Sequence, residues 1–156
     1  HKFGLLFNSF ASDNDLLKQQ ELFFDCMYQL LQPPAIDYVT VPKKEQRVAL
    51  IIEFIRAHYK ENISLQQLAD LARLNPFHLV RLFKKSIGLS PYDYLLIVRA
   101  EEAKQLLRKG SMVQDAASAT GFYDSSHFNR VFCKIAATSP KSFRSSKSQY
   151  RTSFTV

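Results

Sequence analysis

Residues 75 to 91, NPFHLVRLFKKSIGLSP, decide the fold of this chain, because the same design returns 49 positions later as residues 124 to 140, DSSHFNRVFCKIAATSP. The two copies share a histidine, an arginine, a phenylalanine, a lysine and a closing Ser-Pro pair at equal offsets. The matched residues are His78 and His127, Arg81 and Arg130, Phe83 and Phe132, Lys85 and Lys134, Ser90-Pro91 and Ser139-Pro140. A repeat of this kind predicts one supersecondary unit that occurs twice.

Each copy has the pattern of an amphipathic helix. It begins with a residue that caps helices well, Asn75 or Asp124, and Pro76 then stands at the first helical position, where a missing N–H costs nothing. Apolar side chains follow at spacings of three and four, so each set shares one face. These are Leu79, Leu82 and Phe83 in the first copy and Phe128, Val131 and Phe132 in the second. We predict that these faces are buried and the opposite faces exposed.

A shorter helix with small residues precedes each copy. In SLQQLADLA, Ser64 followed by Gln67 fits a capping box, and in MVQDAASAT alanines supply a narrow stripe that a second helix can cross closely. Gly121 supplies the positive φ that the second connecting turn needs. The pattern predicts two helix-turn-helix motifs, over residues 64–88 and 112–137.

A helical hairpin that binds another protein would explain the apolar stripes equally well. It would not explain why both outward faces carry arginine at one offset, Arg81 and Arg130. DNA recognition is therefore favoured, and a protein-interaction module stays as the alternative from another class. The DNA-binding segment of a larger effector-gated or enzymatic protein is a further alternative.

From about Glu45 to Arg144 the chain resembles the DNA-binding domain of the AraC/XylS family of bacterial transcription regulators. The resemblance rests on LADLARLNPFHLVRLFKKSIGLSP, on PYDYLLIVRAEEAKQLL and on AASATGFYDSSHFNRVFCKIAATSPKSFR. It implies an all-α fold in which a long helix joins two helix-turn-helix subdomains. Ala137 departs from the family, which usually has glycine there, and this difference can strain the end of that helix.

The resemblance, together with side-chain reach, implies which residues contact DNA. Arginine can pair with guanine, asparagine with adenine, and apolar side chains with thymine methyl groups. The expected base contacts are Pro76, Phe77, Val80, Arg81, Ser125, Ser126, Asn129 and Arg130. The expected phosphate contacts, which supply affinity without sequence preference, are Ser64, Lys84, Lys85, His127, Lys134 and Arg144. The partner implied is double-stranded DNA.

The charge is distributed unevenly along the chain. Residues 1–42 carry two basic and five acidic side chains, and residues 43–156 carry 19 basic and nine acidic ones. A basic domain attracts polyanions, of which the phosphate backbone is the commonest. A membrane partner is disfavoured, since no apolar run approaches the roughly 20 residues of a spanning helix.

Other chemistry is not indicated. Cys26 and Cys133 lack a CxxC spacing, which is typical of free thiols in a reducing cytoplasm, and no signal peptide precedes them. The four histidines have no metal-ligand spacing, and no phosphate-binding or nucleophile motif occurs. We expect a cytoplasmic protein that is not an enzyme and needs no metal or cofactor.

Residues 1–32 resemble the helical tail of an effector and dimerisation domain, with the weak specificity of any amphipathic helix. The candidate dimerisation residues follow spacings that place them on one apolar stripe. They are Leu17, Phe24, Met27 and Leu31. The stripe is explained by packing against a domain outside this sequence, by a homodimer through residues 14–32, or by folding back on residues 48–55. The homodimer is preferred, because the Pro33-Pro34 linker weakens folding back.

The predicted organisation is thus a tail over residues 1–32, a linker over 33–44, a DNA-binding domain over 45–144 and a flexible C-terminal tail over 145–156. The chain starts with His1, which suggests a segment of something longer. The effector, the operator, the choice between activation and repression, and contact with RNA polymerase stay open.

Overall fold

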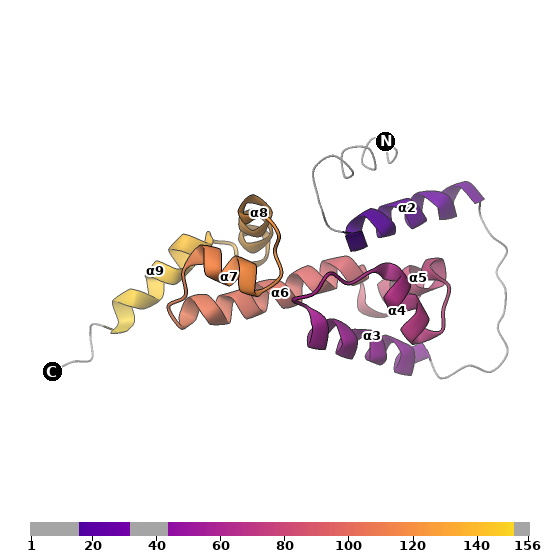
Figure 1. Cartoon of the computed structure of the whole chain (residues 1–156), viewed down its shortest axis with the longest axis horizontal. Coiled ribbons are helices and arrows are strands. Elements are labelled where there is room, and N and C mark those ends of the chain that lie inside the picture. Colours follow the sequence, from indigo (N-terminus) through magenta and orange to yellow (C-terminus); the bar gives the residue numbers. More distant parts are fainter. Residues whose placement is uncertain (1–15, 32–43, 152–156) are drawn as a thin grey trace. The chain divides into compact units, whose positions relative to one another are not determined.

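The computed structural model describes residues 16–31 and 44–151, and every regular element in these ranges is an α-helix. The elements are α2 (Leu16–Leu31), α3 (Lys44–His58), α4 (Leu65–Ala72), α5 (Pro76–Ile87), α6 (Pro91–Arg108), α7 (Val113–Ala119), α8 (Ser125–Ala136) and α9 (Pro140–Arg151) (Figure 1). The expected all-α fold is confirmed. Two compact units divide the chain: α2 to α5 and α6 through Tyr94 belong to the first, and residues 59–61 and everything described from Leu95 onward belong to the second.

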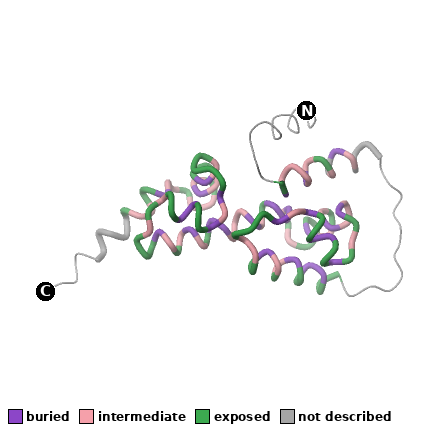
Figure 2. Tube along the Cα trace, viewed as in Figure 1, coloured by how far each residue is buried: buried purple, intermediate pink, exposed green. Residues whose placement is uncertain are grey.

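The first unit is built on an apolar core between α3, α4 and α5. Its helices are buried on one side and exposed on the other, as the colours in Figure 2 show. The large buried side chains are Val48, Ile51, Ile55, Leu65, Leu68, Leu79 and Phe83. Helix α4 begins with the predicted capping box: Ser64 Oγ accepts from Gln67 N at 3.1 Å, and Gln67 Oε1 accepts from Ser64 N at 2.8 Å.

The second unit is packed around an aromatic cluster. Its buried members are Ala103, Leu107, Ala116, Ala117, Phe122, Phe128 and Phe132. The segment 59–61 belongs here because the buried Arg99 of α6 donates to the carbonyl oxygens of Tyr59, at 2.7 Å, and Glu61, at 2.9 Å. Gly121 has the predicted positive φ, +81°, and lies so close to the Lys60 carbonyl that a Cβ there would be 2.7 Å from that oxygen.

Helix α9 extends further than the sequence indicates. The predicted flexible tail starts at residue 145, whereas the helix continues to Arg151. Ser139 Oγ accepts from Ser142 N at 3.1 Å, which caps the start of the helix. Phe143 then packs edge-on against Phe132, with 5.5 Å between ring centroids. This cap and this aromatic contact explain why a polar segment forms a helix.

Candidate nucleic-acid interface

Helix α5 carries the first set of predicted base contacts. The predicted N-cap is confirmed, since Asn75 Oδ1 accepts from Phe77 N at 2.9 Å. Leu79 and Phe83 are fully buried, so the helix has one orientation in the unit. Within the opposite face Arg81 is exposed and Phe77 and Val80 are half-buried. Pro76 is buried, so it is poorly placed for the predicted base contact. Its position at the first turn of α5 suits a role in starting the helix.

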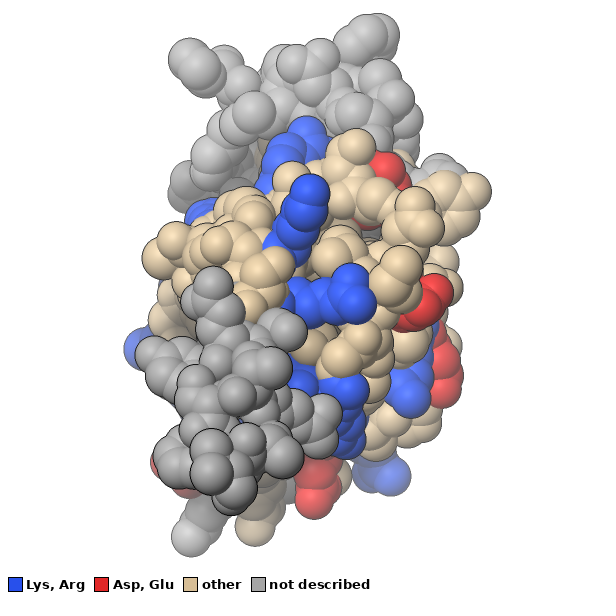
Figure 3. Space-filling view, turned by 90° about the vertical axis from the view of Figure 1, so that its left-hand side faces the viewer, with Lys and Arg blue, Asp and Glu red and all other residues tan. Residues whose placement is uncertain are grey.

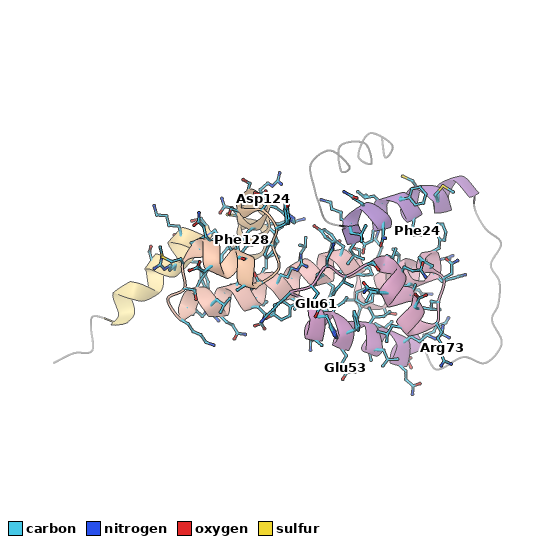
Figure 4. All side chains as sticks on the ribbon, viewed as in Figure 1. Phe24, Glu53, Glu61, Arg73, Asp124 and Phe128 are labelled. Atoms are coloured by element: carbon cyan, nitrogen blue, oxygen red, sulfur yellow. The ribbon has the colours of Figure 1, made fainter. Side chains whose placement is uncertain are left out.

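Helix α8 carries the second set, and it is more open. Both carboxylate oxygens of Asp124 accept backbone N–H groups, from Ser126 at 3.0 Å and from His127 at 3.0 Å, and these bonds hold the pKa of Asp124 below its usual range. Figure 4 marks Asp124 and Phe128, which lie at the start of α8 and in the core beneath it. All four predicted base contacts on α8 are exposed: Ser125, Ser126, Asn129 and Arg130.

The predicted phosphate contacts differ in accessibility. Lys84, Lys85 and Lys134 are exposed, and Arg144 is half-buried. Figure 3 shows that Lys and Arg side chains are exposed on this face of the molecule. Ser64 is half-buried in the α4 capping box, where its oxygen accepts and its hydroxyl proton can still be donated. His127 is half-buried and packs against Phe122 at 5.6 Å between ring centroids, so packing also accounts for this residue.

One exposed residue beside the second set, Tyr123, was missed by sequence reasoning. Tyr123 is 86% exposed and directly precedes the Asp124 cap, a position that places its ring next to the start of α8. Cys133 lies on the same outward face of α8 as Asn129, and its thiol is 3.9 Å from Asn129 Oδ1, one helical turn away. A spacing of four residues on one helix predicts such a contact between Asn129 and Cys133.

The N-terminal stripe lies on the first unit. Leu17 is fully buried in this chain, where α2 contacts α4 and α5. Of the alternatives raised by the sequence, this arrangement corresponds to folding back on the same chain, with the main contacts of α2 made to α4 and α5. Its physical reason is that α4 and α6 offer backbone donors: Gln20 Oε1 accepts from Leu65 N at 2.7 Å, and Glu21 Oε1 accepts from Tyr92 N at 2.6 Å. Apolar periodicity carries no information about such donors.

The other predicted dimerisation residues are placed less deeply. Phe24, marked on α2 in Figure 4, and Met27 are half-buried, and the side chain of Leu31 lies outside the described residues. The homodimer itself stays a prediction. In the described ranges no helix is long and apolar enough to cross a membrane, and no three His, Cys, Asp or Glu residues cluster as metal ligands would.

Comparison with known proteins identifies the family. A family model described as a helix-turn-helix domain matches residues 68–146, about half of the chain. A solved structure described as a probable AraC family transcriptional regulator from Rhodopseudomonas palustris CGA009 is 26% identical, with a TM-score of 0.63, and the match covers 65% of this chain and 97% of that one. This chain belongs to the AraC/XylS family. The two helix-turn-helix subdomains, α4–α5 and α7–α8, are therefore those of an AraC/XylS DNA-binding domain.

Two further similarities define how far the AraC/XylS assignment reaches. The lactose operon transcription activator of Staphylococcus xylosus is 30% identical over 147 residues, which are 93% of this chain and 50% of that protein. This chain therefore spans about half the length of that relative. The DNA-binding domain of AdpA, solved in complex with a target DNA, is 22% identical with a TM-score of 0.63, and the match covers 69% of this chain and 97% of that one. That second similarity shows the fold.

Proposed function

We propose that this chain is the double-stranded-DNA-binding part of a transcription regulator and that α5 and α8 each enter a major groove. Arg81 and Arg130 carry the proposal: both are exposed, they occupy matched positions, and each stands on a helix whose opposite face is buried. An exposed arginine there can pair with both acceptors of guanine. Successive major-groove segments on one face of B-DNA lie about 34 Å apart, and we expect each helix to read one of them.

Binding-site selection from random duplexes tests this proposal. The wild-type chain should recover one preferred sequence, and Arg81→Ala and Arg130→Ala should each lose preference at a different base pair. Lys109→Ala is the control, since Lys109 is exposed in the turn after α6 and outside both motifs. An unchanged preference in Arg130→Ala would remove the base-reading role of that residue, and no preference in wild type would contradict the function.

The role of the whole protein is proposed from its relatives. The S. xylosus relative is a transcription activator, which supports activation over repression. Activation would add RNA polymerase as a partner, and the cytoplasm is where DNA and polymerase of a bacterial cell lie. The relative is a regulator without a named enzymatic activity, so we propose none here.

Homodimer formation through Leu17, Phe24, Met27 and Leu31 is a second proposal, which the length of the apolar stripe supports. Because Leu17 is buried against α4 and α5, such a dimer would form only after α2 leaves these helices. Sedimentation of the chain with and without residues 1–42 measures it. A dimer confined to the longer chain supports the proposal, and a monomer at high micromolar concentration in both contradicts it.

A further inference from the structure

Helix α2 lies on the part of the first unit where DNA is expected. The Phe24 ring rests edge-on against Phe77, with 4.8 Å between centroids and an interplanar angle of 83°. Phe77 is a predicted base contact. Gln20 accepts from Leu65 N, the residue after Ser64, which is a predicted phosphate contact. Helix α2 therefore contacts one predicted base contact, Phe77, and the direct neighbour of one predicted phosphate contact, Ser64.

The polar contacts of α2 use donors that also suit phosphate. The first N–H groups of a helix have no partner within the helix, and they bind phosphate oxygens readily. Gln20 places an oxygen 2.7 Å from such a group on α4, and Glu21 places one 2.6 Å from such a group on α6. Both oxygens stand where a phosphate oxygen could bind.

The groups around Glu21 include a predicted phosphate contact. Glu21 is 8% exposed, and it faces the Tyr92 N–H, the Ser90 hydroxyl and the Asp93 carboxylate near the start of α6 and the Lys84 ammonium group of α5. Lys84 is also a predicted phosphate contact. On α2 itself, Lys18 Nζ lies 5.6 Å from the centre of the Tyr92 ring. The Glu21 carboxylate therefore shares an electrostatic environment with a lysine that DNA would use.

We propose that α2 is an internal competitor of DNA at the first helix-turn-helix motif. While α2 is docked, Phe24 covers Phe77 and Gln20 occupies the start of α4, so α5 engages its DNA segment only after α2 leaves. Among residues 16–31 and 44–151, nothing covers the second motif in this way, since Ser125, Ser126, Asn129 and Arg130 are all exposed. This inference rests on the proposed function, because it concerns the same DNA-binding surface.

The docked state is sensitive to pH. Burial raises the pKa of Glu21 from 4.5 to about 7, against the opposing effects of its hydrogen bonds and of Lys84. A carboxyl group whose pKa is raised in the docked state favours docking fully below pH 4.5 and loses this contribution as the pH rises through about 7. Docking should thus weaken, and the first motif should open, toward alkaline pH.

The first test compares two adjacent phenylalanines on α2. Phe24→Ala removes the ring that covers Phe77, whereas Phe23→Ala removes a ring that is 47% exposed and packs edge-on against Phe24, with 5.6 Å between centroids. The probe is the duplex selected by the wild-type chain, alongside the same duplex scrambled in the segment whose preference depends on Arg81. Loss of an aromatic contact of this kind changes an equilibrium constant by about two- to tenfold.

Phe24→Ala should therefore bind the selected duplex about two- to tenfold more tightly than wild type, and Phe23→Ala should give a clearly smaller gain. The gain should vanish on the scrambled duplex. Equal affinities of wild type and Phe24→Ala would overturn the inference while leaving the proposed function intact. Failure of wild type to select any duplex would instead contradict the proposed function.

The second test leaves the packing intact. Glu21→Gln keeps the acceptor oxygen for Tyr92 N and removes the charge, so α2 should stay docked at alkaline pH. We expect Glu21→Gln to bind the selected duplex several-fold more weakly than wild type at pH 8, and the two to agree at pH 5. The proposed competition would be overturned if the ratio of the wild-type affinity to the Glu21→Gln affinity did not change with pH. It would also be overturned if this ratio changed equally on the scrambled duplex.

Discussion

The two helix-turn-helix motifs share one plan and differ in what surrounds them. In the first, Ser64 caps α4, and α2 places Gln20 and Phe24 on the outward side of the motif. In the second, Met112 starts α7 with no side-chain cap, and every predicted base contact on α8 is exposed. The repeated sequence thus specifies the helices, and the proposed competition by α2 gives a segment outside the repeat the control of access to the first motif.

The largest expected effect is on stability and concerns Gly121, in the turn between α7 and α8. Gly121→Ala should lower the free energy of unfolding of the second unit by about 3 kcal/mol or more, since it combines an unfavourable φ with a backbone clash. The added Cβ would lie 2.7 Å from the Lys60 carbonyl oxygen, beside the carbonyls that Arg99 binds. Urea unfolding followed by circular dichroism measures the loss.

Gly88→Ala is the matched control for this measurement. Gly88 also has a positive φ, +80°, but nothing lies within 4 Å of an added Cβ. Its cost should be confined to backbone strain, about 1 to 2 kcal/mol. Equal costs at Gly88 and Gly121 would show that the contact with Lys60 contributes nothing.

The next effect compares the two arginines. Arg130→Ala should cost about 1 to 3 kcal/mol of binding free energy on the selected duplex and leave non-specific binding nearly intact. Arg81→Ala should cost less in the same titration, because the proposed competition by α2 weakens the contribution of the first motif in wild type. A larger loss at Arg81 would reverse the comparison between the motifs.

A smaller effect concerns the ionic part of binding. The logarithm of affinity should fall with the logarithm of salt concentration by about 0.9 for each phosphate contact, so Lys84→Ala should flatten this slope by about one contact. Lys109→Ala, outside both motifs, should leave the slope unchanged. Titrations at several salt concentrations with selected and scrambled duplexes decide the role of Lys84: a loss confined to the selected duplex would make Lys84 a base contact.

The smallest effect concerns the ends of the two recognition helices. Ala137 ends α8 with φ +54°, and its counterpart Gly88 ends α5 in the same left-handed region. Ala137→Gly should therefore stabilise the second unit by about 0.5 to 1 kcal/mol. Thermal unfolding measures the change, and a destabilised Ala137→Gly variant would show that the helix end adapts to alanine without strain.

Local features were predictable because they depend on near neighbours in sequence. The caps at Asn75 and Asp124, the capping box at Ser64 and the positive φ of Gly121 all follow from short-range geometry, and each is confirmed. The buried stripes follow from helical periodicity, and Leu79, Phe83, Phe128 and Phe132 are fully buried as predicted. The exposure of Arg81 and Arg130 follows from the same periodicity.

Long-range polar contacts were not predictable in this way. The bonds from Gln20 to Leu65 and from Glu21 to Tyr92 join residues 45 and 71 positions apart, and no periodic pattern encodes which helix start a distant side chain reaches. Apolar periodicity alone therefore does not indicate which apolar surface buries Leu17. The roles of the predicted DNA contacts stay predictions until the arginine and lysine variants are measured.

Arg99 makes the second half of the molecule discontinuous in sequence. Its guanidinium group depends on two carbonyls contributed by residues 59–61, which precede the first motif in the chain. A fragment that starts at Leu95 would keep α7, α8 and α9 and would leave that buried charge without these acceptors. The second motif is therefore not an independent sequence segment that could be exchanged for the first. A chimera that takes the second motif from a relative should also take residues 59–61 together with α6 to α9.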